Sequence, residues 1–296
     1  MVRAAVSRAL RLDRLAIGAV GATLALMTLG SVVHGTGSSL ACPDWPLCHG
    51  SALPAMTGGV QFEHSHRLAA AAVVVLTIAL AVAAWRQSDR LERRLALAAC
   101  GLIALQAVLG AATVLMGLPP AVSVAHLATS MAFLAVLVVL AGRLGGFPRS
   151  RADAATRTWL TIAAMVVYLQ VLLGGVVRHM GAALVCPDLP SCAGSMWPVA
   201  LLQRLHMVHR AGALVALIVV VVATLVLYRK AQPVGARYAL VLAPAVLVLC
   251  QGALGIAVVS TGAPLAIVTA HHATGAFLLA SLVLAWTSCR SESQGA

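Results

Sequence analysis

Long apolar runs separated by short polar segments make up most of this chain. A helix needs about 20 apolar residues to cross the hydrocarbon core of a bilayer. Eight runs are suited to this, near residues 14–33, 63–85, 95–116, 121–142, 158–178, 203–228, 238–259 and 264–287. The pattern therefore predicts an all-α polytopic membrane protein with eight transmembrane helices. No small-residue cleavage site clearly follows the first run, so we expect that run to be retained.

Composition agrees with this fold class. Hydrophobic residues make up 61% of the 296 residues and charged residues 9%, whereas soluble domains carry roughly 25% charged residues. The net charge of +12 is compatible with nucleic-acid binding, but the positions of the charges favour a membrane topology.

The basic residues predict the orientation of the chain. All of them except Arg67, Arg178, Arg204 and Arg210, that is 16 of 20, lie on one side of the predicted helices. The positive-inside rule makes that side cytoplasmic. We therefore expect a multi-pass protein of a prokaryotic plasma membrane, with both termini in the cytoplasm and no nucleic-acid partner.

The chain repeats itself after 143 to 145 residues. Both Cys42–Cys48 and Cys186–Cys192 read Cys-Pro-Asp-x-Pro-x-Cys. Other recurring residues are His66-Arg67 with His209-Arg210, and Gln106, Gly110, His126 and Thr129 with Gln251, Gly255, His271 and Thr274. Such a repeat indicates a duplicated structural unit. Each copy contains four predicted helices, so the copies share one orientation, and two pseudo-symmetric four-helix bundles are expected.

The repeat also sets the expected domains. They are an N-terminal half at 1–144, a cytoplasmic linker at 145–157, a C-terminal half at 158–287 and a cytoplasmic tail at 288–296. The linker is polar, rich in arginine, and contains glycine and proline. We expect it to join the halves without taking part in chemistry.

Four of the seven cysteines occur as pairs in the outer loops, Cys42 with Cys48 and Cys186 with Cys192. Disulfides are permitted outside the cytoplasm, and two short disulfides are the favoured interpretation. A redox-active dithiol that passes electrons is the second interpretation. A four-cysteine zinc site is the third, although five residues between the cysteines do not match the spacing of zinc knuckles.

Four histidines belong to the repeat: His66, His126, His209 and His271. Each falls near the outer end of an even-numbered helix, so two of them can face each other in each bundle. Facing helices lie about 8–10 Å apart, and two imidazoles can then hold one haem iron between them. The alternatives are polar groups hydrogen-bonded in the core, a proton relay, and a zinc site, for which two ligands per bundle are too few.

The halves differ three residues before a repeated histidine. Glu63 precedes His66, whereas His206 precedes His209. Residues three apart share a helix face, and a carboxylate at a membrane span is costly unless it has a task such as proton transfer. An ion pair with Arg67 is the alternative interpretation. The difference favours chemistry in the first half and cofactor binding in the second.

Taken together and in order, these motifs resemble the haem A synthase family of membrane proteins. The resemblance rests on the two cysteine loops, Glu63-His-Ser-His66-Arg67, the Gly-Leu-Pro-Pro turn before His126, and His209-Arg210 with His271. It extends from about residue 15 to residue 287. The second cysteine loop lacks the tryptophan and leucine of the first, so the resemblance does not imply equal functions for the two pairs.

The resemblance implies an oxidoreductase that converts haem O into haem A by oxidising the C8 methyl group of the porphyrin to a formyl group. His66 and His126 would hold the substrate haem O, and His209 and His271 would be the axial ligands of a haem b cofactor. Glu63 matches the essential acid of the family. The outer cysteines match the loop disulfides of the family, and the resemblance implies a redox role for the first pair.

Two arginines and the expected reaction indicate further binding partners. Arg67 and Arg210 each follow a proposed iron ligand, where a guanidinium group can hold haem propionates in a bidentate pair. Haem O synthase and terminal-oxidase assembly are the expected partners besides haem O, haem A and the lipid bilayer, and a homo-oligomer is left open.

Two other functions are open at this point. A bis-histidine membrane cytochrome without its own substrate chemistry explains the four histidines but not Glu63. A transporter built from repeats explains the duplication but not the disulfide loops.

Overall fold

The structure is a computed structural model that describes residues 2–145, 147, 150–231, 235 and 237–290. Within these residues, eight helices are long and apolar enough to cross a membrane, which confirms the predicted fold class. They are α1 (Val2–Gly35), α2 (Gly58–Gln87), α3 (Arg90–Leu115), α4 (Pro120–Arg143), α5 (Ala154–His179), α6 (Leu201–Ala231), α7 (Arg237–Ser260) and α8 (Leu265–Ser288). Two short strands, β1 (Ser150–Arg151) and β2 (Cys289–Arg290), pair in parallel.

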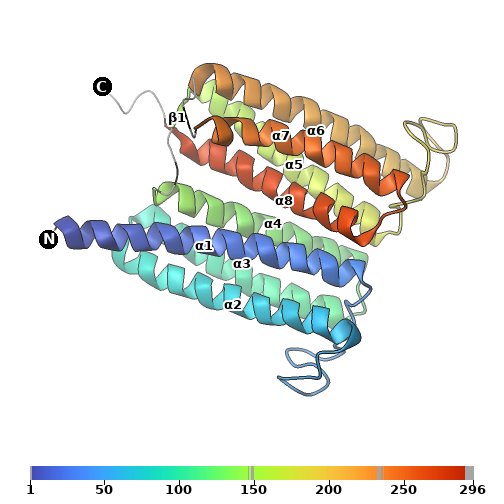
Figure 1. Cartoon of the computed structure of the whole chain (residues 1–296), viewed down its shortest axis with the longest axis horizontal. Coiled ribbons are helices and arrows are strands. Elements are labelled where there is room, and N and C mark those ends of the chain that lie inside the picture. Colours follow the sequence, from blue (N-terminus) through green and yellow to red (C-terminus); the bar gives the residue numbers. More distant parts are fainter. Residues whose placement is uncertain (1, 146, 148–149, 232–234, 236, 291–296) are drawn as a thin grey trace. The chain divides into compact units, whose positions relative to one another are not determined.

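The chain divides into two compact units, residues 1–149 and 150–296. In the first unit α1 packs on α2 and α4, and α3 packs on α2 and α4. In the second unit α5 packs on α6 and α8, and α7 packs on α6 and α8. Each unit is therefore a four-helix bundle with the same neighbours in the same order (Figure 1).

Small residues allow the helices of the first bundle to approach closely. Its buried core contains Ala16 and Ala19 on α1, Ala84 on α2, and Ala99 on α3, together with larger side chains such as Leu80, Phe133 and Leu137. Close backbone approach through small residues is typical of helix packing in membranes. Large apolar side chains such as Val75 and Val108 are exposed on the outside of the bundle, where lipid can cover them.

The helix turns of the two units are built alike. Gly117 and Leu118 lie in the left-handed region between α3 and α4, and Gly262 and Ala263 do so between α7 and α8. A left-handed residue ends a helix sharply and is favourable for glycine. A proline follows each turn, and α4 begins with Pro120 at its first position, which suits the missing N–H of proline.

Helix α5 begins at Ala154, inside the segment 145–157 that the sequence predicts as linker. Asp153 caps this helix by accepting a hydrogen bond from the backbone N–H of Thr156 at 2.8 Å, and it pairs with Lys230 on α6 at 2.9 Å. The hydroxyl of Thr156 also donates to Asp153 at 2.7 Å, and this bond, together with Lys230 and the backbone N–H, holds the pKa of Asp153 well below its usual value. The predicted tail at 288–296 falls mostly outside the described residues, but Ser288 ends α8 and the next two residues form β2.

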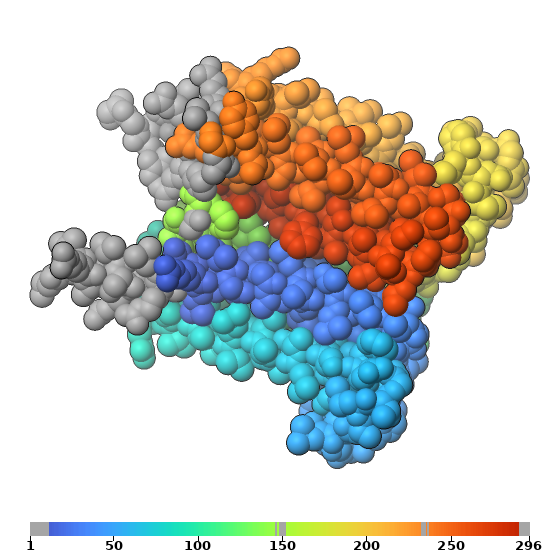
Figure 2. Space-filling view, viewed as in Figure 1, coloured from blue at the N-terminus to red at the C-terminus, as the bar shows by residue number. Residues whose placement is uncertain are grey.

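The two cysteine loops fold alike, and both predicted disulfides are present, Cys42–Cys48 and Cys186–Cys192. In each loop the second cysteine pairs with a serine three residues later through two backbone hydrogen bonds. Both loops project beyond the helices of their own unit (Figure 2; residues near 50 in light blue, residues near 190 in yellow). We call this end of each bundle its disulfide end.

We expect the double substitution Cys186→Ser with Cys192→Ser to lower the free energy of unfolding by about 2 kcal/mol, because the small ring no longer restricts the unfolded chain. Thermal unfolding of the purified protein in detergent measures this as a lower Tm. Cys100→Ser is the control, since Cys100 is a free cysteine within α3. An equal Tm for the double variant and the control would contradict the expectation.

Candidate functional site

Each of the four repeated histidines lies against a glycine of the preceding helix. A Cβ atom on Gly30 or Gly174 would come within 3.0 Å of the Cε1 atom of His66 or His209, and a Cβ on Gly110 or Gly255 within 3.3 Å of the Cε1 atom of His126 or His271. These distances are shorter than ordinary contacts of a Cβ atom. The backbone of each odd-numbered helix therefore supports an imidazole ring of the next helix.

Glutamines one turn before three of these glycines contact the same histidines. Gln170 donates to the backbone oxygen of His209 at 2.8 Å and its Nε2 lies 3.0 Å from the Nδ1 atom of that ring. Gln106 donates to the backbone oxygen of His126 at 2.6 Å, and Nε2 of Gln251 lies 3.3 Å from Nε2 of His271. Residues four apart share a helix face, so each pair forms one supporting stripe.

The structure brings the histidines together in two pairs, one in each bundle. His66 and His126 are close enough to interact electrostatically, and so are His209 and His271. The Nδ1 atoms of three of these rings, His66, His126 and His271, are buried without a hydrogen bond to any described residue. A neutral imidazole has one lone pair to offer to a metal. Each pair therefore contains at least one ring nitrogen that has no partner among the described residues and could bind a metal.

Glu63 takes part in a buried network at the disulfide end of the first bundle. Its side chain is 5% exposed, and one oxygen accepts from Arg67 at 2.6 Å while the other accepts from the backbone N–H of Cys42 at 2.8 Å. The ion pair with Arg67 that the sequence offered as an alternative is thus present. Each carboxylate oxygen has two lone pairs and accepts one of these two hydrogen bonds, so further lone pairs of Glu63 are not used by them.

Arg67 also fastens the first cysteine loop to α2. Its guanidinium donates to the backbone oxygens of Asp44 at 2.6 Å and Cys42 at 2.9 Å, and to that of Leu47. The carboxylate of Asp44 accepts from the backbone N–H groups of Gly50 and His49, which holds the pKa of Asp44 below its usual value. The loop is therefore closed by a disulfide, an internal carboxylate and one guanidinium.

Arg210 makes the corresponding contacts in the second bundle. It donates to the backbone oxygens of Asp188 at 2.7 Å, Ser191 at 2.8 Å and Cys186 at 2.6 Å. In place of Glu63 stands His206, whose ring bonds to the backbone oxygen of Ala182 at 2.8 Å. Both arginines thus hold loops, and their predicted contact with haem propionates stays a prediction.

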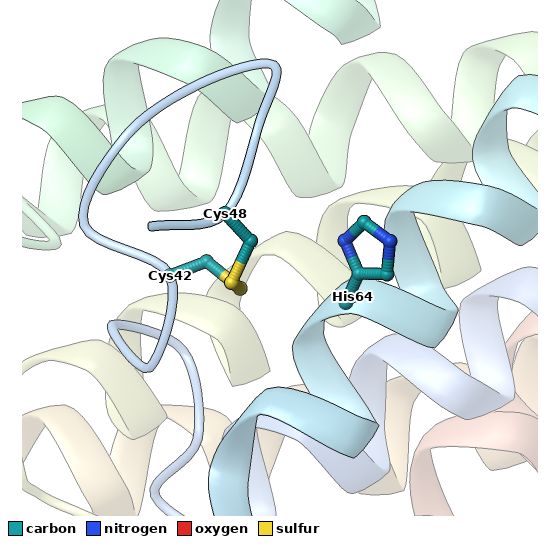
Figure 3. Close-up of side chains that lie close together, drawn as sticks. All are labelled: Cys42, Cys48 and His64. Atoms are coloured by element: carbon teal, nitrogen blue, oxygen red, sulfur yellow. A yellow bond between two sulfur atoms is a disulfide. The ribbon is translucent and has the colours of Figure 1, made fainter. Parts of the chain in front are cut away.

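His64 lies beside the first disulfide. Its ligand atoms and the two sulfur atoms of Cys42 and Cys48 lie within 4.8 Å of one another, and Figure 3 shows the ring facing the disulfide. The two sulfur atoms are bonded to each other, so this group does not offer two thiolates to a metal in this form. The corresponding residue of the second bundle is Met207, which packs on the second disulfide.

Sequence reasoning did not assign a function to the supporting glycines or to Gln170. The signal was present, because glutamine followed four residues later by glycine occurs at 106–110, 170–174 and 251–255. In the first bundle Leu26 replaces the glutamine before Gly30. The signal becomes informative only when the contacting helices are known.

Comparison with known proteins places these features in a family. A sequence model described as cytochrome oxidase assembly protein, COX15-CtaA, matches residues 60–283. A protein of Geobacillus thermodenitrificans named "Heme A synthase" is 31% identical over 263 residues, which cover 84% of this chain and 82% of that protein. A protein of the same name from Bacillus licheniformis is 30% identical over 261 residues, which cover 84% of this chain and 86% of that protein.

A graded series of glycine substitutions tests the support of the rings. Gly174→Ala should displace His209 and Gly255→Ala should displace His271, and overpacking of this kind costs about 1–3 kcal/mol. We expect both variants to purify with less haem per protein, measured by absorption, with the larger loss for Gly174→Ala. Gly252→Ala is the control, because a Cβ there meets nothing within 4 Å. Full haem content in both test variants would refute the role of the glycines.

Proposed function

This chain belongs to the COX15-CtaA family of cytochrome oxidase assembly proteins, and from this membership we infer that it is a haem A synthase. It is a multi-pass membrane oxidoreductase that acts on haem O and makes haem A. Conversion of a methyl group to a formyl group with water as the oxygen source releases four electrons and four protons. The protein must therefore hold the substrate, accept protons and provide a path for electrons.

This proposal rests on one difference between two otherwise similar sites. Both bundles pair two glycine-supported histidines, but only the first bundle places a buried carboxylate, Glu63, one turn before a histidine of the pair. We assign the substrate haem O to His66 and His126 and a haem b cofactor to His209 and His271. Haem b supplies one-electron redox chemistry when it is bound.

Glu63 is the proton acceptor in this proposal. It lies three residues before His66 on α2, so both side chains belong to the same face of the helix. Arg67 and the N–H of Cys42 fix the carboxylate, which leaves lone pairs free for a proton from the methyl group or from the attacking water. Fixed geometry of the base favours proton transfer because little reorganisation is needed.

The cysteine loop closes the disulfide end of the substrate site in this proposal. Arg67 joins the loop to the helix that carries His66, so the loop and the predicted iron ligand move together. A closed end keeps bulk water from the reacting carbon and strengthens the electrostatic contacts inside. A redox part for Cys42 and Cys48 stays a prediction.

We propose the orientation and the wider setting from the charge distribution and the reaction. Both termini are in the cytoplasm, with the disulfide ends outside, where disulfides persist. An enzyme that makes haem O must supply the substrate, and terminal oxidases use the product. A bis-histidine cytochrome without substrate chemistry needs no proton acceptor, so Glu63 would serve there only to hold Arg67 and the cysteine loop.

We expect Glu63→Gln to lower the rate of haem A formation at least about 100-fold, because the amide cannot accept the proton. The absorption spectrum of haem b should stay unchanged, since Glu63 lies in the other bundle. Haem extraction from cells that make haem O measures the product. Glu92→Gln is a control, because Glu92 caps α3 at the opposite end of the first bundle. Normal haem A production by Glu63→Gln would rule out its role.

We expect His209→Gly to lose the low-spin spectrum of haem b, and added imidazole to restore part of it, because imidazole can occupy the place of the missing ring. The measurement is the difference spectrum of the reduced and oxidised purified protein. His206→Ala is the matched control, one turn away on the same helix and bonded to a backbone oxygen. A full haem b spectrum in His209→Gly without imidazole would show that His209 is not a ligand of the haem iron.

A further inference from the structure

Arg178 differs from the other arginines at the disulfide ends. Arg67, Arg204 and Arg210 all donate to backbone oxygens of nearby loops or helix starts. The Nε atom of Arg178, in contrast, is buried and has no hydrogen bond to any described residue. None of the ion pairs found among the described residues includes it. The second bundle thus contains a guanidinium whose Nε donor has no acceptor among the described residues.

Arg178 continues the stripe of α5 that supports His209. Gln170 and Gly174 both contact His209, and Arg178 follows at the same spacing of four residues. Side chains at this spacing lie one above the other on a helix face. Arg178 therefore stands one turn beyond the glycine on which the imidazole rests, toward the disulfide end of the bundle.

The first bundle has a different residue at this place. Its corresponding stripe on α1 is Leu26, Gly30 and His34. Gly30 supports His66 as Gly174 supports His209, but the ring of His34 lies 3.4 Å from the hydroxyl of Ser39. Histidine is largely neutral near pH 7 whereas arginine stays charged. The two sites thus differ in a permanent positive charge beside the supported imidazole.

A buried Nε–H group without an acceptor is costly, because this donor has left water without a replacement. A carboxylate is the natural partner, since the planar fork of arginine matches its two oxygens. A lipid phosphate is the other anion available at this depth. The buried Nε favours the carboxylate, because an arginine that reaches for the lipid surface extends all its donors outward.

We propose that Arg178 is the carboxylate-binding residue of the C-terminal site, where it pairs with a propionate of the haem held by His209. This inference rests on the proposed function. It explains how two similar sites serve opposite needs. The site with Arg178 retains its cofactor, whereas the site with His34 lacks this anchor and releases its product.

The test measures how fast haem b leaves the purified protein in detergent, with excess apomyoglobin as acceptor. We expect Arg178→Gln to release haem b at least about 10-fold faster, because the loss of one charge-assisted hydrogen bond weakens binding by about this factor. Arg178→Lys should release haem b at a rate between those of the unchanged protein and Arg178→Gln, because lysine keeps the positive charge but cannot bind both carboxylate oxygens in parallel. Arg204→Gln is the control and should behave as the unchanged protein.

Reconstitution with the dimethyl ester of haem b identifies the partner of Arg178. The unchanged protein should release the ester faster than the free acid, and Arg178→Gln should show a much smaller difference between them. If Arg178→Gln accelerates the loss of acid and ester equally, the guanidinium serves the fold or a lipid phosphate and the proposal is overturned. Equal release rates for acid-form haem from Arg178→Gln and the unchanged protein would also overturn it.

The reverse exchange tests the first bundle. His34→Arg should increase the amount of haem A that stays with the purified protein, and an unchanged amount would contradict the explanation of product release. These outcomes are separate from the proposed function. If the haem b spectrum is unchanged in His209→Gly, the proposed haem b site is wrong. If haem b needs His209 but its release does not depend on Arg178, only the inference about Arg178 is wrong.

Discussion

Contact between an imidazole ring and a bare glycine backbone is the constraint on which both bundles depend. Four rings rest on four glycines, where an added Cβ atom would lie only 3.0 to 3.3 Å from the ring and would push it away. The same absence of a side chain lets neighbouring membrane helices approach closely, which is where helix association in lipid gains its energy. The same contacts therefore determine both how the helices of a bundle pack and how the predicted iron ligands are oriented. A change to the packing also changes the orientation of the rings.

The halves diverge around this shared frame at a few positions. One guanidinium in each half fastens a disulfide loop to the helix that carries a supported histidine, through carbonyl oxygens of the loop. Beside that common clamp, the first half has the buried pair of Glu63 and Arg67, and the second half has His206 bonded to a backbone oxygen. The two copies thus share the contacts around their histidines, while one copy has an acid and the other has Arg178, whose Nε has no partner among the described residues.

Much of this arrangement could be predicted from the sequence, because hydrophobic length, charge asymmetry and the repeat are local or periodic signals. The backbone partners of Arg67 could not, since they lie 20 to 25 residues away in a loop whose path depends on the disulfide. The role of Gly30 was equally hidden, because glycine is common in membrane helices and its meaning depends on which helix it faces. The start of α5 was placed too late because Asp153, a helix cap, reads as one more polar linker residue.

We propose that this chain oxidises haem O in one bundle with the help of a haem in the other. The most direct test of this proposal is the extraction of haem from cells that make haem O, with and without this protein. We expect haem A only in the cells that contain the protein, together with a low-spin haem spectrum in the purified protein. Unchanged haem O with no haem A, alongside a normal low-spin spectrum, would contradict the proposal and leave an electron carrier in its place.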